Sequence, residues 1–387
     1  MSLRHGIVRY SDEFKSQVLK LQAHHWGPDL ALNAAYLEWK YEDNPYVKTP
    51  LIYLALWEGD VVGMRGLCGA RWEMGSSGQA VSVLCASDLV IAPAHRNRGL
   101  LNRMTMTALK DLVNSEYRYV FNLSPSPITY LSFLAMGWRS IGPLETMRWQ
   151  ATGGTILRRL LRRGQTLRHL FPASRRLRTG AKRKTAPSLA GACRTFCSLD
   201  ADRGGEARAV GPHVSVHESP RPEAMAELIA RIGSDGRMRH VRDAQYFGWR
   251  FRNPMSMYRF LFWEGTQLEG YLVLRTRLRA VRKIVSIVDW EATNGQVREE
   301  LLWAAIRWGD FAQVDIWSAT HAGEVKVLLE RTGFRRVNEP KGVAQPRPAV
   351  LIRAVSDQMQ GSQWSVADRW LLDLTNWDLR MVYSDGS

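Results

Sequence analysis

The chain has 387 residues, of which 45% are hydrophobic, and a net charge of +16. This length favours two domains, and the apolar fraction is enough to bury a core. The composition excludes a membrane-spanning helix, because no apolar run approaches the roughly 18 residues required, and a disulfide framework, because there are only four cysteines. The first ten residues contain no apolar signal region, so we expect a cytoplasmic protein.

The N-terminal segment predicts a strand from Gly6 to Tyr10 and then a helix from Asp12 to His24, with Ser11 as its N-cap. An aromatic motif, Trp39-Lys40-Tyr41, follows this helix. Two interpretations of the motif stay open: Trp39 and Tyr41 line a substrate pocket, or the aromatic side chains pack beneath a sheet.

The most informative stretch is a predicted strand from Val83 to Ile91. It ends at Pro93 and runs through the turn Arg96-Asn97-Arg98-Gly99 into a helix, where apolar residues recur on one face from Leu100 to Leu112. The N–H groups at a helix start are unpaired, and Arg96 and Arg98 add positive charge. This combination favours a bound phosphate or pyrophosphate.

A second group of elements lies downstream. Phe121 to Leu123 is typical of a short strand, Tyr130 to Met136 of a helix, and Gly137-Trp138 closes the group. Together with Arg96-x-x-Gly99, this order resembles the acyl-CoA site of the GNAT N-acetyltransferase superfamily. The sequence departs from the family pattern at Leu101, where a small residue is usual.

The resemblance implies acetyl-CoA as co-substrate and assigns roles to residues of the first half. The strand residues Leu89, Val90 and Ile91 would hold the pantetheine arm and polarise the thioester. Ser124 would contact the pantetheine. The pyrophosphate would be held by the loop and helix start, namely Arg96, Asn97, Arg98, Gly99, Leu100 and Leu101.

Two residues, Asp88 and Tyr130, are candidates for the catalytic groups. Asp88 orients or deprotonates the acceptor amine, or else it pairs with a nearby arginine. The tyrosine that often serves the family as general acid falls at Phe133 here, and Tyr130, one helical turn earlier, either replaces it or packs in the core. We predict no metal site, because Cys193 and Cys197 have no second cysteine pair nearby.

The chain contains an internal repeat whose order is kept in both halves. Trp39-Lys40-Tyr41 recurs as Trp249-Arg250-Phe251, Trp57-Glu58-Gly59 as Trp263-Glu264-Gly265, and Ser87-Asp88-Leu89 as Val288-Asp289-Trp290.

From this repeat we predict an α/β fold of two tandem GNAT-like domains, each a mixed, mostly antiparallel twisted sheet flanked by helices. The domain with the acyl-CoA loop spans 1–150 and the degenerate copy spans 212–355. A basic amphipathic and flexible bridge, 151–211, joins them, and a Trp-rich tail, 356–387, is expected to pack onto the body.

The two copies differ where the chemistry is expected. After Asp289 the second copy has no Arg-x-x-Gly, and it places Glu299 and Glu300 near the start of a predicted helix. These carboxylates would repel a pyrophosphate. We therefore expect acyl-CoA in the first copy only, while the second copy shapes the acceptor site or buries an edge of the first.

The positive charge is concentrated in the bridge. Residues 151–199 contain twelve Lys or Arg and no Asp or Glu, and residues 155–184 combine leucines and arginines at helical spacing. A solvated linker and a peripheral contact with the inner membrane surface both fit this pattern. Nucleic acid is the least favoured partner, because no stacking aromatic side chains interleave with the charges.

The sequence thus predicts an N-acetyltransferase that moves an acetyl group from acetyl-CoA to a primary amine. Its motifs are similar to those of bacterial GNAT proteins encoded with surface-polysaccharide machinery, which suggests an amino sugar or polysaccharide precursor as acceptor. Two alternatives stay open. One is an aminoacyl transferase that uses aminoacyl-tRNA, which the intact loop disfavours, and the other is a non-catalytic CoA-binding or scaffold protein.

Overall fold

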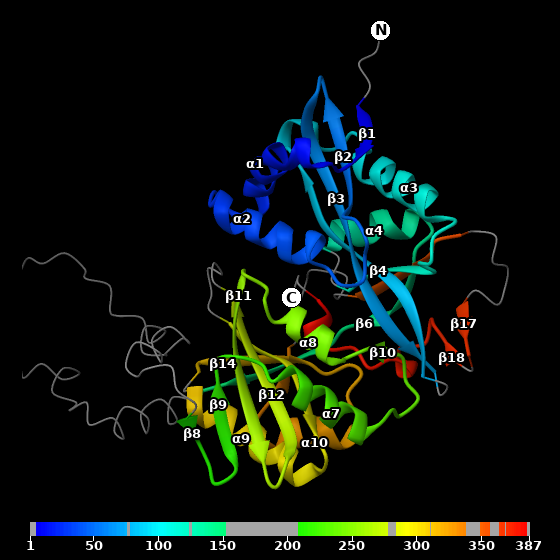
Figure 1. The fold of residues 1–387 in the computed structure, drawn as a ribbon. Helices are drawn as coiled ribbons and strands as arrows, with labels where there is room; N and C mark the ends of the chain where they lie inside the picture. The colour runs from blue at the N-terminus through cyan, green and yellow to red at the C-terminus, as the bar shows by residue number, and fades with distance from the viewer. Residues whose placement is uncertain are drawn as a thin grey trace, which may run out of the picture.

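The computed structural model describes residues 5–75, 78–123, 126–151, 208–277, 284–309, 311–337, 349–356, 364–367 and 369–384. These residues form two mixed sheets with helices on their faces, the first in the upper half and the second in the lower half of Figure 1. The predicted fold class, two α/β domains in tandem, is confirmed.

The first sheet has the strand order β1-β2-β3-β4-β5-β16-β6, and the short β10 pairs with β3. Its pairings are antiparallel except for β4 with β5, which run parallel. The strands are β1 (Gly6–Arg9), β2 (Leu51–Trp57), β3 (Asp60–Met74), β4 (Gln79–Ile91), β5 (Tyr119–Asn122), β6 (Arg139–Pro143), β10 (Arg239–His240) and β16 (Ala349–Ala354).

The second sheet repeats this plan, with the order β15-β7-β14-β13-β12-β11-β9-β8. Its parallel pair is β13 with β14. The strands are β7 (Thr146–Gln150), β8 (Arg208–Ala209), β9 (Val214–His217), β11 (Ser256–Glu264), β12 (Leu268–Arg277), β13 (Val285–Ala292), β14 (Gln313–Trp317) and β15 (Arg335–Arg336).

Helices cover both faces of each sheet. In the first domain, α1 (Lys15–Trp26) and α2 (Leu30–Leu37) pack into one core, and α3 (Leu100–Leu112) and α4 (Pro127–Ala135) pack into another. The second domain repeats this with α7 (Pro222–Ile232) and α8 (Ala244–Arg250) on one face and α9 (Gly295–Gly309) and α10 (Gly323–Arg331) on the other.

The helix predicted from Tyr130 to Met136 begins earlier, at Pro127. The Ser126 side chain caps its first turn by accepting a hydrogen bond from the Thr129 N–H at 3.3 Å, and proline suits the first helical position. Ser126 and Pro127 are therefore the start signal of α4.

Each copy supplies a strand to the other copy's sheet, in addition to the short β10 that pairs with β3. β7, which follows β6 directly in the chain, crosses to the second sheet and lies between β14 and β15. β16, near the end of the second copy, returns to the first sheet and lies between β5 and β6. The predicted domain boundaries at residues 150 and 355 therefore do not separate the two sheets, because each copy supplies a strand to the other.

The two domains also share a hydrophobic core. Trp39 and Trp249, which occupy the same place in the repeat, stack with ring centroids 5.3 Å apart, and each indole N–H donates to the other residue's carbonyl at 2.8 Å. Trp377 of the tail is fully buried against Trp72 and Phe121 of the first domain. The reciprocal contact of Trp39 with Trp249 therefore joins equivalent positions of the two domains in one hydrophobic core.

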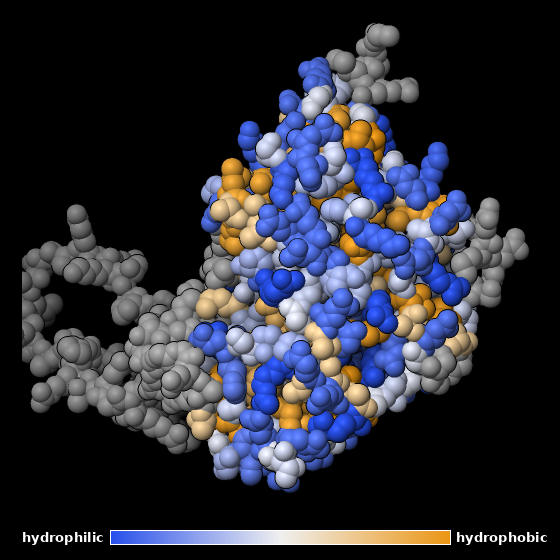
Figure 2. All heavy atoms as spheres, in the orientation of Figure 1, coloured by the Kyte–Doolittle hydropathy of each residue, from blue (hydrophilic) through white to orange (hydrophobic). Residues whose placement is uncertain are grey.

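The face seen in Figure 2 is covered mostly by hydrophilic residues, with hydrophobic residues in scattered groups. No helix among the described residues combines the length and apolar character needed to cross a membrane. Residues 152–207, most of the predicted basic bridge, lie outside the described part of the chain, so their proposed membrane contact stays a prediction.

Candidate functional site

The first domain has an opening in its sheet at the end of β4. β4 and β5 pair only at Leu84 with Val120 and at Cys85 with Phe121, although β4 continues to Ile91. The pairing of β4 with β3 shifts register between Met64 and Gly66, so that Asp88 and Leu89 bulge, and Asp88 has a φ of 46°. Beyond the bulge, no strand among the described residues pairs with the edge of β4 that faces away from β3.

The loop after β4 leads into a helix start that can bind an anion. Pro93–His95 forms a single 3₁₀ turn, Asn97 and Gly99 adopt φ values of 60° and 70°, and α3 begins at Leu100. Glycine at the N-cap has no side chain to occupy the first-turn N–H groups. These donors and the positive end of the helix dipole are therefore available to a ligand.

The strand edge and the helix start face the same pocket, with a volume of about 710 Å³. Its walls come from β4, the loop, α3, α4 and the end of α1. The lining residues are His24, His25, Leu89, Val90, Ile91, Arg96, Asn97, Gly99, Leu100, Leu101, Asn102, Ser126, Thr129, Ser132, Ala135 and Met136.

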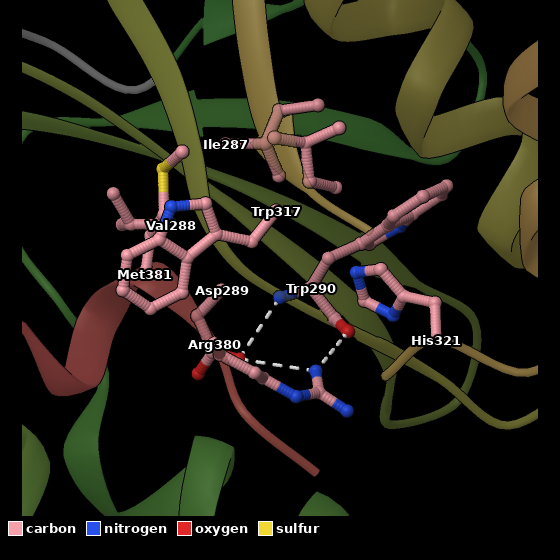
Figure 3. Close-up of a pocket in the computed structure, with 9 residues that line it drawn as sticks. Ile287, Val288, Asp289, Trp290, Trp317, His321, Arg380 and Met381 are labelled. Carbon is pink, nitrogen blue, oxygen red and sulfur yellow. Dashed lines mark hydrogen bonds and ion pairs between the residues drawn. The ribbon is translucent and has the colours of Figure 1, made fainter. Parts of the chain in front are cut away.

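The second domain has the same divergence of strands, but its space is filled. β13 and β14 pair only at Val285 and Ser286, and a register shift places a bulge near Asp289. Trp317 and the tail residues Arg380 and Met381 occupy the space beyond, leaving a void of about 10 Å³ (Figure 3).

No family model matches the sequence, and no curated protein matches it either. Solved structures do match the fold. A GCN5-related N-acetyltransferase from Anabaena variabilis aligns over 91% of this chain and 73% of its own, with a TM-score of 0.56 at 12% identity. A probable N-acyltransferase from Enterococcus faecalis gives the same coverage and TM-score at 9% identity, and a GCN5-related N-acetyltransferase from Kribbella flavida gives 0.52 at 12% identity.

The chain has the GNAT fold. The resemblance inferred from the loop and the downstream elements is thereby confirmed at the level of fold.

Most residues predicted to hold acyl-CoA in this GNAT fold line the pocket, on the strand edge, the loop and the helix start. Two predicted residues are not among them. The guanidinium of Arg98 lies over the Trp57 ring, 5.9 Å from its centroid, and Ser124 lies outside the described residues. Ser126, two positions later, lines the pocket instead.

Asp88 lies in a buried network rather than in the pocket. The Tyr41 hydroxyl donates to its Oδ2 at 2.7 Å and Lys40 Nζ donates to its Oδ1 at 3.1 Å, while the side chains of Lys40 and Asp88 are only 1% and 5% exposed. The Tyr36 hydroxyl adds a contact at 3.4 Å. Both carboxylate oxygens are thus engaged by protein groups, which favours a structural role for Asp88 over proton transfer with an acceptor.

A π-helical turn at Glu38–Glu42 brings these partners to Asp88. It buries Lys40 and Tyr41 together, and a Cβ on Gly66 would overlap the Tyr41 hydroxyl. Burial first, and then the Asp88 charge, holds the pKa of Tyr41 well above its usual value. Tyr41 is therefore a neutral hydrogen-bond donor to Asp88. It is buried and does not line the pocket, in agreement with the second interpretation of the aromatic motif.

The remaining predicted site residues also lie away from the pocket. Trp39 is 4% exposed and belongs to the contact between domains. Tyr130 is half-buried and packs against the core beneath α3 and α4, next to the fully buried Phe133. The structure thus places Tyr130 as a packed aromatic, which was one of its two predicted roles.

His25 is a pocket residue that the sequence analysis missed. It is exposed at the end of α1 and faces the pocket beside His24. Surrounding protein desolvates the ring and lowers the pKa of His25; Asp88 opposes this shift, whereas Lys40 and Arg277 add to it. Arg277 ends β12, so a charge of the second domain acts on the pKa of His25.

Proposed function

We propose that the chain is an N-acetyltransferase that takes its acetyl group from acetyl-CoA. The observation that carries this proposal is the pocket of about 710 Å³ that joins an unpaired strand edge to an uncapped helix start. The strand edge offers backbone groups to a pantetheine arm, and the helix start with Arg96 offers donors to a pyrophosphate. The pantetheine arm and the pyrophosphate are two chemically distinct parts of coenzyme A.

The proposed acetyl transfer uses two parts of the pocket, the main chain near Val90 and the side chain of His25. Main-chain groups near Val90 hold the thioester carbonyl and stabilise the charge that develops on its oxygen. The amine nitrogen forms the new C–N bond as the C–S bond breaks, and the departing thiolate takes up a proton. His25, with a lowered pKa, is neutral near pH 7 and accepts the proton that the amine must lose.

The acceptor of the acetyl group in this proposal is a primary amine. An amino sugar or a polysaccharide precursor is proposed on the resemblance of the motifs alone. A cytoplasmic location is proposed for an enzyme of this kind, because acetyl-CoA is found there.

The test is release of free thiol from acetyl-CoA in the presence of glucosamine, glucosamine phosphates, lysine and spermidine. His25→Gln should lower the amine-dependent rate by about a hundredfold or more, because general base catalysis contributes that much. It should also remove the fall in wild-type activity below pH 6.5, where the imidazole becomes protonated and cannot act as base.

His24→Gln is the matched control, since the neighbouring side chain lines the same pocket. It should leave the rate within a few fold of wild type. If the protein binds acetyl-CoA but releases no thiol with any of these amines, the non-catalytic alternative is favoured.

A further inference from the structure

The second domain contains a separate pocket of about 240 Å³ that the proposed acetyl transfer does not use. Its walls come from the end of α7, β13, the first turns of α9 and α10, and the tail. These elements correspond to α1, β4, α3 and α4 around the first pocket, and the second pocket lies beside the filled space at the strand divergence, with which it shares Trp290, His321 and Arg380. The small volume, roughly eight water molecules' worth, excludes a ligand as large as coenzyme A.

Arginine side chains form the inner wall of this pocket. Arg239, Arg298 and Arg380 are 12%, 16% and 9% exposed. Of the four carboxylates that line the pocket, Glu291 and Asp378 are inside, whereas Asp235 and Glu324 lie at the rim with 55% and 77% of their side chains exposed.

Arg298 is the cation least committed to a partner within this wall. Glu291, its nearest buried carboxylate, is bound by Arg242 at 2.6 Å and by Arg380 at 2.7 Å, and it lies 3.9 Å from Arg298. The contact of Arg298 with the exposed Glu324 is 3.5 Å, and its hydrogen bond to the Ala292 carbonyl is 3.4 Å. An anion in the pocket would find this guanidinium available.

Two neutral donors point to the same kind of ligand. The indole N–H of Trp290 is buried and has no hydrogen-bond partner among the described residues, although the side chain lines the pocket. Figure 3 shows this indole beside the His321 ring, with the Arg380 guanidinium nearby. α10 starts in the same wall, and its N-cap Ala322 provides no side-chain cap. An unsatisfied buried donor is costly, so each of these groups gains from an acceptor.

We propose that this pocket binds a small metabolite carrying a phosphate group, held by Arg298, the Trp290 indole and the first turn of α10. Phosphate suits an arginine fork and a helix start together. The bound group would also connect α9 and α10 to the tail through Arg380, which lines the same wall. The second domain would then be a binding domain rather than a degenerate remnant.

The test is calorimetric titration of the full chain with inorganic phosphate and glycerol 2-phosphate. Arg298→Gln should weaken binding about tenfold, the loss expected for one charged hydrogen bond. Arg307→Gln removes the same charge from an exposed position of the same helix and should leave the affinity unchanged. Trp290→Phe should weaken binding without altering net charge, and it provides a second readout if Arg298→Gln fails to fold.

A further titration separates this pocket from the first one. Because the proposed function also places a phosphate group in the first pocket, inorganic phosphate is titrated into the full chain saturated with free CoA, and the affinity should stay unchanged. Loss of phosphate binding in the presence of CoA, equal affinity in Arg298→Gln and wild type, or no wild-type binding below about 10 mM would each overturn the proposal.

Discussion

Asp88 illustrates how burial decides the role of a carboxylate. In the repeat it matches Asp289, and both lie at a strand bulge beside basic side chains. A carboxylate whose two oxygens are already bound by Lys40, Tyr41 and Tyr36 holds α2 and the following π turn to the sheet. Its effect on chemistry would then be indirect, through the shape of the pocket floor.

Replacing Asp88 by Asn leaves the Lys40 ammonium buried without its counterion. Breaking a buried ion pair costs about 3–5 kcal/mol, so Asp88→Asn should lower the free energy of unfolding by that amount in urea denaturation. Asp43→Asn, at an exposed pair 3.7 Å from Arg252, should change it by at most about 1 kcal/mol. If Asp88→Asn keeps wild-type stability but loses activity, Asp88 acts directly on the substrate.

The residues of the acyl-CoA loop could be found from sequence because the loop geometry is local. A proline that ends a strand, two positions with positive φ and a glycine at the helix N-cap are fixed by residues close together in the chain. His25 could not be found in this way. Its place in the pocket depends on how the end of α1 meets β4, more than fifty residues away in the sequence.

At the level of elements, the C-terminal tail fills the space between the diverging strands β13 and β14 of the second domain. Arg380 donates to Asp289 at 3.2 Å and to the Trp290 carbonyl at 2.6 Å (Figure 3). It also pairs with Glu291 and Asp378 at 2.7 and 3.0 Å. It therefore closes the diverging strands with a charge network. The sequence indicated a packed tail from its tryptophans but gave no sign of this network.

Arg380→Met should destabilise the protein by about 3–5 kcal/mol, because buried carboxylates lose a counterion. Guanidinium denaturation measures this directly. Arg336→Met removes an arginine that is 62% exposed and 3.4 Å from Glu145, so it should change stability by about 1 kcal/mol or less. Equal stability of both variants would show that the tail is not held by its charges.

The sequence predicts where the helices and strands lie along the chain, but it does not predict which sheet each strand joins. The apolar spacing of α3 and the run of β4 identify these elements, because periodicity reports which side of an element is buried. The apolar pattern of β7 and β16 fits a strand in either sheet equally well. Which partner each strand meets is decided by the whole chain, so the exchange could not be read from local pattern.

At the scale of the molecule, the exchanged strands and the shared core make the two domains interdependent. A fragment spanning 1–150 would lack β16, which pairs with both β5 and β6, and would expose the aromatic surface that meets Trp249 and Trp377. We expect this fragment to be unfolded or aggregated by circular dichroism and gel filtration. The full chain should unfold in a single transition, because neither sheet is complete without the other.

A folded, monomeric 1–150 fragment, or two separate unfolding transitions in the full chain, would contradict this dependence. It would indicate that the strand exchange adds little to stability.

The measurement that tests the central claim most directly is calorimetric binding of acetyl-CoA to the full chain. Wild type should bind at one site, and Gly99→Glu should abolish binding, because it places a carboxylate where the pyrophosphate is expected. Gly99→Asn should retain much of it, since asparagine tolerates the φ of 70° at this position. Gly295→Glu puts the same charge at the start of α9 in the second domain, where a side chain meets nothing within 4 Å, and should leave binding intact. Unchanged binding in Gly99→Glu, or its loss in Gly295→Glu instead, would contradict the assignment of acetyl-CoA to the first domain.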